Sequence, residues 1–263
     1  MTGTVVYCNG RPATVEDLTG PALRNDGHFT TFQLRGRAVR GFALHLQRLD
    51  EASRALFDTG LDPDLVRRAV AAAVIGTAAQ DATVRITVVP GAAGGASGLD
   101  VLVSIAPPAD PEPAPLRLRS FVFQRDTAAL KHVGTFPLFQ HQRLARRMGD
   151  DDALFVDPDG LVIEGSVWNV GLWDGATLVW PRADALRGTQ ERLLQAGLDA
   201  LGIEQVTRPV MLSEFDAGTA AFACNARGQR LIGSVDGRLL GQGAGLQALL
   251  ARALNTQPRV PVA

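Results

Sequence analysis

The sequence predicts a mixed α/β (α+β) protein built of two domains. Three observations predict this class: strand-like and helix-like apolar patterns alternate along the chain, the 263 residues are 46% hydrophobic, and one proline-rich segment interrupts the pattern. A chain of this length and apolar content is long enough to bury two cores. We therefore expect an N-terminal α/β domain over residues 1–106 and a C-terminal domain over residues 117–263.

The N-terminal domain is expected to open as antiparallel sheet. Val5 to Tyr7 leads into Asn9-Gly10, a hairpin turn pair, so residues 11–15 are expected to return as the partner strand. A first helix is indicated by apolar residues at helical spacing before Gly60, and a second by Asp62-Pro63, an N-cap followed by proline. Further strands are predicted at residues 28–34, 39–44, 84–89 and 101–105.

The domain boundary is predicted at residues 107–116. Five prolines stand between Pro107 and Pro115, and a segment of this composition continues neither a helix nor an inner strand. Such a segment is extended and semi-rigid, which suits an interdomain linker.

The C-terminal domain is predicted to alternate strands and helices in the same way. Pro158-Asp159-Gly160 reads as a type I turn between two strands, and residues after Asn255 are expected to be disordered. Helices are predicted at residues 138–148, 188–201 and 246–254, and strands at residues 117–124, 153–157, 161–164, 168–173, 177–180, 220–224 and 231–235.

Composition excludes several classes of function. The net charge of -1 with interspersed signs argues against nucleic-acid binding. No stretch reads as a leader peptide or a membrane span, so we expect a cytoplasmic protein with no membrane partner. Cys8 and Cys224 give no CxxC spacing, and the four histidines form no ligand pattern, so no metal site is expected.

One lysine stands out as a candidate for chemistry. The 26 Lys and Arg residues include a single lysine, Lys131, and arginine cannot replace lysine in an imine because its guanidinium does not deprotonate in proteins. Glu164 lies in an otherwise apolar strand pattern that predicts burial. A buried carboxylate needs a cation or strong hydrogen-bond donors, so a positive partner is expected for Glu164.

Two further features suit an anion. Arg48 lies on the flank of the first helix, where a solvated arginine is the alternative, and Gly188-Thr189-Gln190 opens a helix whose N-terminal N–H groups favour negative charge. Pyridoxal 5′-phosphate would satisfy all four features, since it has an aldehyde for Lys131, a ring nitrogen for Glu164 and a phosphate for the other two.

The sequence from Tyr7 to Gly237 also resembles the class IV (fold type IV) pyridoxal-phosphate enzymes, which include branched-chain and D-amino-acid aminotransferases and 4-amino-4-deoxychorismate lyase. In that family the Schiff-base lysine lies some thirty residues before a segment that reads D-A-L-F-x-D-x-D-G-x-V-x-E-G-x-x-x-N-V, and residues 152–170 match this segment closely. His45-Leu46-Gln47-Arg48-Leu49 resembles the family's H-x-x-R-L. Residues 186–190 resemble its phosphate loop L-P-G-I-T, except that Arg187 replaces proline and Gln190 replaces threonine.

The resemblance implies a fold and a set of roles. The fold would have a smaller N-terminal and a larger C-terminal domain with the cofactor in the interdomain cleft, usually as a homodimer. Lys131 would form the Schiff base, and Glu164 would pair with the pyridine nitrogen. The remaining cofactor-binding residues that it implies are Arg48, Asn169, Gly188, Thr189, Gln190, Asn225 and Ala226.

The implied function is transfer of an amino group from an amino acid or amine to a keto acid. The alternative is 4-amino-4-deoxychorismate lyase, which residues 25–31, Lys131-His132 and Cys224-Asn225-Ala226 resemble, although the loop 90–98 lacks the lyase's arginine. A second alternative is a non-catalytic binding module on the same fold. The candidates for contacts with the small-molecule substrate are His28, Thr30 and the loop 90–98. The other interpretation of His28 is a turn residue that binds no ligand.

Overall fold

The computed structural model describes residues 3–91 and 98–262. The chain divides into two compact units. The first comprises Met1–Ala109, Leu130–Gly134 and Pro258–Ala263, and the second comprises Asp110–Ala129 and Thr135–Gln257. Both units combine helices with β-sheet, which confirms the predicted mixed α/β class.

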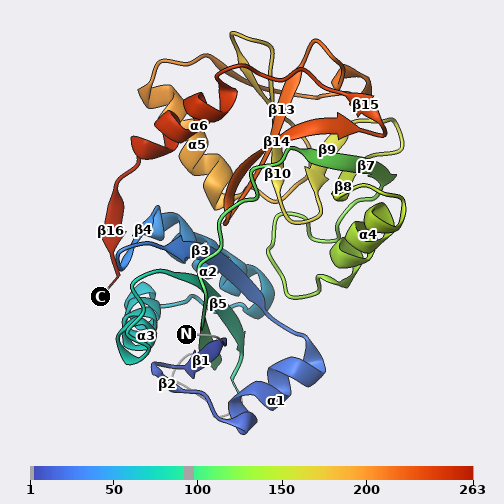
Figure 1. Ribbon diagram of the computed structural model, residues 1–263. Helices are drawn as coiled ribbons and strands as arrows, with labels where there is room; N and C mark the ends of the chain where they lie inside the picture. Colours follow the sequence, from blue (N-terminus) through green and yellow to red (C-terminus); the bar gives the residue numbers. More distant parts are fainter. Residues whose placement is uncertain (1–2, 92–97, 263) are drawn as a thin grey trace. The chain divides into compact units, whose positions relative to one another are not determined.

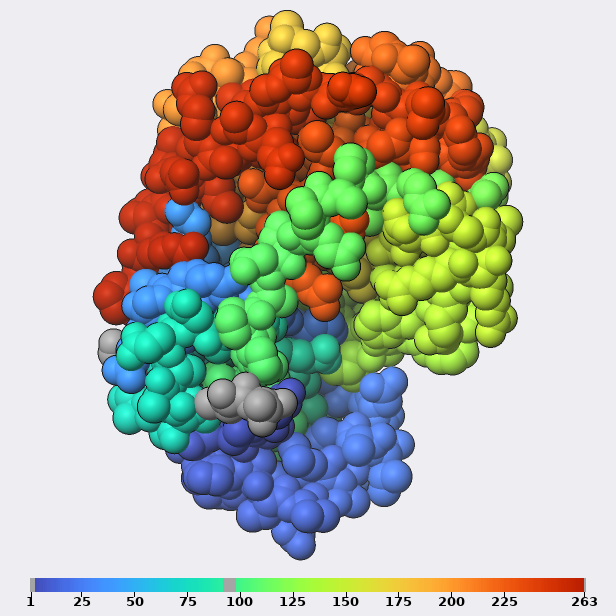
Figure 2. Space-filling model, viewed as in Figure 1, coloured from blue at the N-terminus to red at the C-terminus, as the bar shows by residue number. Residues whose placement is uncertain are grey.

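The units differ from the predicted domains in two segments. Leu130–Gly134 and Pro258–Ala263 belong to the first unit, although both were expected in the C-terminal domain. The reason is main-chain pairing. The carbonyl of Lys131 accepts a hydrogen bond from the N–H of Phe29, and Arg259–Pro261 pairs with Ala38–Arg40. The first division falls after Ala109, within the predicted linker, whose mostly exposed residues lie in the green part of the surface in Figure 2.

The first unit is built on an antiparallel five-stranded sheet with the order β2-β1-β6-β5-β3 (Figure 1). Strand alternation puts every second residue of β3 under the helix α2 and leaves Phe29 and Thr31 on the other face. The elements of this unit are β1 (Val5–Cys8), β2 (Arg11–Pro12), α1 (Val15–Arg24), β3 (His28–Leu34), β4 (Ala38–Arg40), α2 (Phe42–Phe57), α3 (Pro63–Gly76), β5 (Ala82–Pro90), β6 (Leu99–Ala106) and β16 (Arg259–Pro261).

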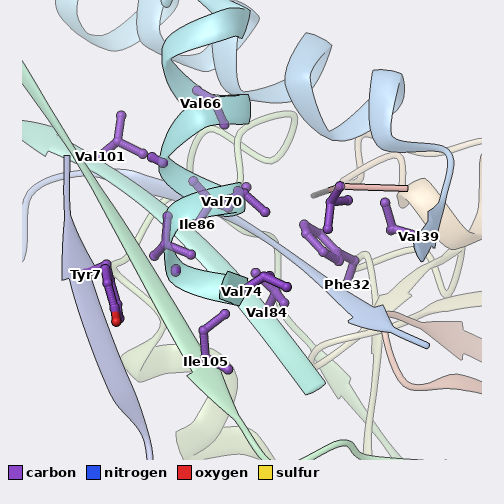
Figure 3. Packing of buried hydrophobic residues seen from close by; sticks show 14 of the residues in the cluster. Tyr7, Phe32, Val39, Val66, Val70, Val74, Val84, Ile86, Val101 and Ile105 are labelled. Atoms are coloured by element: carbon purple, nitrogen blue, oxygen red, sulfur yellow. The ribbon is translucent and has the colours of Figure 1, made fainter. Parts of the chain in front are cut away.

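The core of this unit lies between the sheet and the helices. Figure 3 shows Val70 and Val74 of α3 beside Ile86 and Val84 of β5, all of them fully buried. Each such side chain contributes roughly 1.5–3 kcal/mol when it is removed from water. This core fixes β3, the strand on which the lysine segment rests.

Three expectations for this unit are wrong. Residues 11–15 give only the two-residue β2, because the side chains of Thr14 and Asp17 form a capping box that starts α1. The strand expected over 39–44 ends at Arg40, since Gly41 adopts φ 63° and α2 begins at Phe42. The expected disordered tail instead contains β16, which pairs with β4.

The second unit contains a mixed sheet with the order β12-β11-β10-β13-β14-β7-β8-β9, to which β15 adds beside β14 (Figure 1). Helices α5 and α6 pack against each other so closely that a Cβ at Gly197 would collide with the backbone of Ala253. The elements are β7 (Leu116–Val122), α4 (Phe136–Arg147), β8 (Asp152–Val156), β9 (Val162–Gly165), β10 (Asn169–Trp173), β11 (Leu178–Pro181), α5 (Thr189–Ala200), β12 (Gln205–Arg208), the 3-10 turn η1 (Leu212–Glu214), β13 (Ala220–Asn225), β14 (Gly228–Val235), β15 (Arg238–Leu239) and α6 (Leu246–Asn255).

No helix in the described ranges is long and apolar enough to cross a membrane.

Candidate functional site

The segment that carries Lys131 is held on β3 by main-chain hydrogen bonds. The N–H of Phe29 donates to the carbonyl of Lys131 at 2.8 Å, and the N–H of Val133 donates to the carbonyl of Gly27 at 2.9 Å. His28 and His132 form the antiparallel bridge between these two bonds. The start of the lysine side chain is therefore fixed relative to the core of the first unit.

Gly27 allows β3 to begin close to β5. Its φ of +151° is a conformation that L side chains rarely adopt, and a Cβ there would lie 2.6 Å from the carbonyl oxygen of Val88. A side chain at Gly27 would displace the backbone here, including the Gly27 carbonyl that accepts a hydrogen bond from Val133. The glycine is thus required for the backbone that positions Lys131.

Two cations lie near the ring of Phe29. The Nζ atom of Lys131 is 5.0 Å from the ring centroid, and the guanidinium of Arg85 on β5 is 3.6 Å from it. The negative face of an aromatic ring attracts a cation at these distances. Burial lowers the pKa of Arg85 below its usual value. No local sequence pattern predicts this arrangement, because it joins three separate segments.

The two predicted substrate residues are buried beneath α2. The Nε2 atom of His28 lies 2.9 Å from the hydroxyl of Ser53, and the hydroxyl of Thr30 lies 2.6 Å from Nδ1 of His45. Thr30 has no exposed surface, whereas the buried Nδ1 of His28 has no hydrogen-bond partner within the described part of the chain.

Both histidines are in the neutral form near neutral pH. Burial lowers the pKa of His28 to about 4 and that of His45 to about 3. The charge of Arg48, which lies one turn after His45 on α2, also lowers the pKa of His45. The predicted phosphate ligand Arg48 is half-buried on the flank of this helix.

Glu164 is buried on β9 in the second unit, as the sequence predicted, with a side chain only 5% exposed. Its Oε1 atom lies 3.5 Å from Nη1 of Arg125, whose side chain is 7% exposed. Arg125 is a positive partner for this acid that sequence reasoning missed. No local pattern marks it, because the two residues are 39 positions apart.

The chain after Glu164 is fixed by small and polar residues. A Cβ at Gly165 would collide with the ring of Trp168, and the N–H of Gly165 donates to the carbonyl of Trp168 at 2.9 Å. The carboxylate of buried Asp152 accepts a hydrogen bond from the hydroxyl of Ser166 at 2.6 Å. These contacts determine where β9 ends and how Glu164 is presented.

Asn169 joins the sheet to the loop before α5. Its amide donates to the carbonyl of Leu186 at 2.6 Å, and a Cβ at Gly188 would collide with the oxygen of that amide. Asn169 also pairs with Cys224 in the sheet, one residue before Asn225. The structure therefore brings Asn169, Gly188 and the end of β13 into one region of the second unit.

The N-terminus of α5 already contains an acid. The carboxylate of Glu191, which is buried, accepts a hydrogen bond from the N–H of Gly188 at 3.1 Å. Arg187 pairs with the same carboxylate at 2.9 Å. The N–H of Gly188 is thus bonded to Glu191, whereas Thr189 and Gln190 supply the first helical N–H groups.

The other predicted contacts lie close to this helix. The amide of Gln190 donates to the side-chain oxygen of Gln229 at 3.4 Å, and Gln229 pairs with Cys224 in the sheet. Asn225 ends β13 and accepts a hydrogen bond from the N–H of Arg227 at 2.8 Å, and Ala226 lies in the turn between them.

Other features that bear on a site are few. Among the described residues, no group of three or more His, Cys, Asp or Glu side chains is arranged to hold a metal ion. Cys8 and Cys224 are both buried free thiols. The substrate candidate loop 90–98 falls mainly on residues 92–97, which lie outside the described residues.

Comparisons with known proteins agree with one family. A sequence model described as amino-transferase class IV matches residues 27–230. No curated protein matches the chain.

Solved structures match nearly the whole chain. A hypothetical aminotransferase from Mycobacterium tuberculosis in its PLP-bound form is similar with a TM-score of 0.81 and 22% identity, over 97% of this chain and 99% of that one. A branched-chain aminotransferase from Thermoproteus uzoniensis with norvaline has a TM-score of 0.84 and 20% identity, over 99% and 100%. A putative 4-amino-4-deoxychorismate lyase from Legionella pneumophila has a TM-score of 0.79 and 20% identity, over 93% and 95%. At these identities the likeness shows the fold.

Proposed function

Because the chain belongs to the class IV aminotransferase family, we propose that it transfers an amino group from an amino acid or amine to a keto acid. Enzymes of this family use pyridoxal 5′-phosphate. The observation that carries the proposal is the position of Lys131. The only lysine of the chain lies in the matched region, and two hydrogen bonds between its segment and β3 hold the main chain around it.

The described residues fit this cofactor. We propose that Lys131 binds its aldehyde carbon and that Glu164 accepts a hydrogen bond from its ring nitrogen. A buried glutamate suits the second role because burial strengthens its interaction with a cationic N–H. For the phosphate, we propose Arg48, the N–H groups of Thr189 and Gln190 at the start of α5, and contacts from Asn225 and Ala226, with Gly188 and Asn169 shaping the loop.

When bound, the cofactor withdraws electrons from the substrate Cα and so makes its proton acidic. We propose that the amine of the substrate would displace Nζ of Lys131 from the aldehyde carbon, and that the freed Nζ would then take this proton and return it to C4′ of the cofactor. A lysine suits this step because its amine can lose and regain a proton, which a guanidinium does not do. The hydrogen bonds to β3 restrict where the side chain begins.

We propose that His28 contacts the substrate through its unpartnered Nδ1 atom. Thr30 stays a proposed substrate residue. Its hydroxyl is bonded to His45, and through that bond it would orient the helix that carries Arg48. A homodimer is also proposed, and light scattering on the purified protein tests it.

4-Amino-4-deoxychorismate lyase is the second candidate. It is favoured by one observation: the two segments whose sequences resemble that enzyme, residues 25–31 and Lys131-His132, pair with each other in the structure. A non-catalytic binding module on the same fold is the third, and it predicts a protein that takes up no cofactor.

The test uses the full chain with added cofactor. A panel of amino donors is screened for conversion of the cofactor to its amine form and for the keto product, with Lys131→Arg as the matched control that keeps the charge. Conversion by a donor, absent in the control, supports the aminotransferase. Release of pyruvate from aminodeoxychorismate establishes the lyase instead. Failure to take up cofactor contradicts both enzymes.

A further inference from the structure

Arg125 is the one buried arginine among the residues the structure describes. It follows β7 and lies in the second unit with Glu164. Arginine is rarely buried without an anion, because transfer of its charge out of water is costly. The anion is Glu164, whose Oε1 atom is 3.5 Å from Nη1 of Arg125.

The pair determines the charge of Glu164. An arginine side chain keeps its proton at every pH that a protein tolerates. The nearby positive charge therefore favours the ionised form of Glu164, which burial alone would disfavour. The charge of Arg125 thus opposes the effect of burial, which favours a neutral carboxylic acid.

The charge of Glu164 matters for the proposed reaction. An ionised carboxylate accepts a hydrogen bond from a protonated ring nitrogen and also stabilises that proton by its charge, whereas a neutral carboxylic acid lacks the charge. We propose that Arg125 is a positioning residue that keeps Glu164 ionised and directs one of its oxygens toward the ring nitrogen of the cofactor. This inference rests on the proposed function and assigns Arg125 a role through Glu164 only.

A rival role for Arg125 is direct contact with the cofactor phosphate or a substrate carboxylate. The two roles differ in a double-variant comparison. If Arg125 acts through Glu164, its replacement has no further effect once Glu164 is neutral. If it binds a ligand anion directly, the two replacements have independent effects that multiply.

The experiment compares the full chain with Arg125→Gln, Glu164→Gln and the double variant. Arg119→Gln is the matched control, because Arg119 pairs with Asp150 at 2.8 Å in the same unit. Two quantities are measured: the dissociation constant for pyridoxal 5′-phosphate, and the NMR shift of an isotope-labelled ring nitrogen, which reports its protonation. We expect Arg125→Gln to weaken binding about tenfold and to shift the nitrogen toward its neutral value, while Arg119→Gln changes neither.

The double variant is expected to bind as Glu164→Gln does, within about twofold. Multiplied effects, or an Arg125→Gln variant that binds and titrates like the wild type, would overturn the inference. If Arg125→Gln does not fold, the dissociation constants of Glu164→Gln and the double variant decide between the two roles of Arg125. This comparison stays possible because the double variant removes both buried charges. A wild-type chain that binds no cofactor refutes the proposed function itself and the inference with it.

Discussion

The main-chain N–H of Phe29 donates to the carbonyl of Lys131 at 2.8 Å, so the lysine segment is joined to β3. The lysine is therefore positioned by a strand that is packed against the core of the first unit rather than by its own neighbours in sequence.

Replacement of Gly27 is expected to destabilise the lysine segment. Gly27→Ala forces a side chain into a positive φ and against the carbonyl of Val88, at a cost of roughly 1–3 kcal/mol. Urea denaturation monitored by circular dichroism measures the change in unfolding free energy. Gly20→Ala is the control, since a Cβ at Gly20 meets nothing within 4 Å and alanine is favoured in a helix. Equal stability of the two variants would contradict this account of Gly27.

A coupled pair of substitutions tests the loop before α5. Gly188→Ala places a methyl group against the side chain of Asn169, so we expect lower thermal stability. In the background of Asn169→Ala the collision is absent, and the same substitution is expected to cost at least about 1 kcal/mol less. A thermal-unfolding double-mutant cycle gives the coupling. Simple additivity would mean that the two residues do not touch.

The stability of the protein is expected to fall as pH decreases from about 6.5. The unfolded histidines titrate near this value, whereas burial lowers the pKa of folded His28 to about 4 and of His45 to about 3. Between these values the unfolded chain binds more protons than the folded one, so acid favours unfolding.

Urea denaturation at a series of pH values between 7 and 5 measures this slope. His45→Gln is expected to flatten the curve, because it removes one of the two histidines whose pKa burial lowers. A slope that does not respond to His45→Gln would show that other groups cause the acid sensitivity.

Arg187 is expected to support cofactor binding even though it replaces the proline of the family pattern. Its pairing with Glu191 offsets a buried negative charge at the helix end where we propose the phosphate binds. Arg187→Ala is therefore expected to weaken cofactor binding, by roughly tenfold in the dissociation constant.

Adding Glu191→Gln to Arg187→Ala is expected to restore most of the affinity, since the uncompensated charge is then gone. Arg252→Ala, on the exposed side of α6, makes the same change in net charge and serves as control. An unchanged dissociation constant for Arg187→Ala would place the phosphate elsewhere.

Local signals in the sequence predicted much of the fold. The Asp62-Pro63 start of α3 and the buried strand around Glu164 follow from capping and from apolar pattern, and both are confirmed. The helix α1 has such a signal too, since Thr14 and Asp17 have the spacing of a capping box, and this signal conflicts with the strand expected over residues 11–15.

Features that depend on distant contacts were not predictable in this way. β16 forms because Arg259–Pro261 pairs with β4. Lys131 belongs to the first unit because its segment forms main-chain hydrogen bonds with the start of β3. The pairing of Arg125 with Glu164 likewise has no local signature. The need of a buried acid for a cation was predictable from physical chemistry, whereas the identity of that cation required the structure.

The most direct test of the central claim is reduction of the cofactor-loaded protein with borohydride, followed by peptide mass mapping. We expect the reduced cofactor to be attached to Lys131 and to no other residue, and we expect no attachment in Lys131→Arg. A wild-type protein that carries no covalently attached cofactor after reduction, or carries it on the N-terminal amine, would contradict the claim.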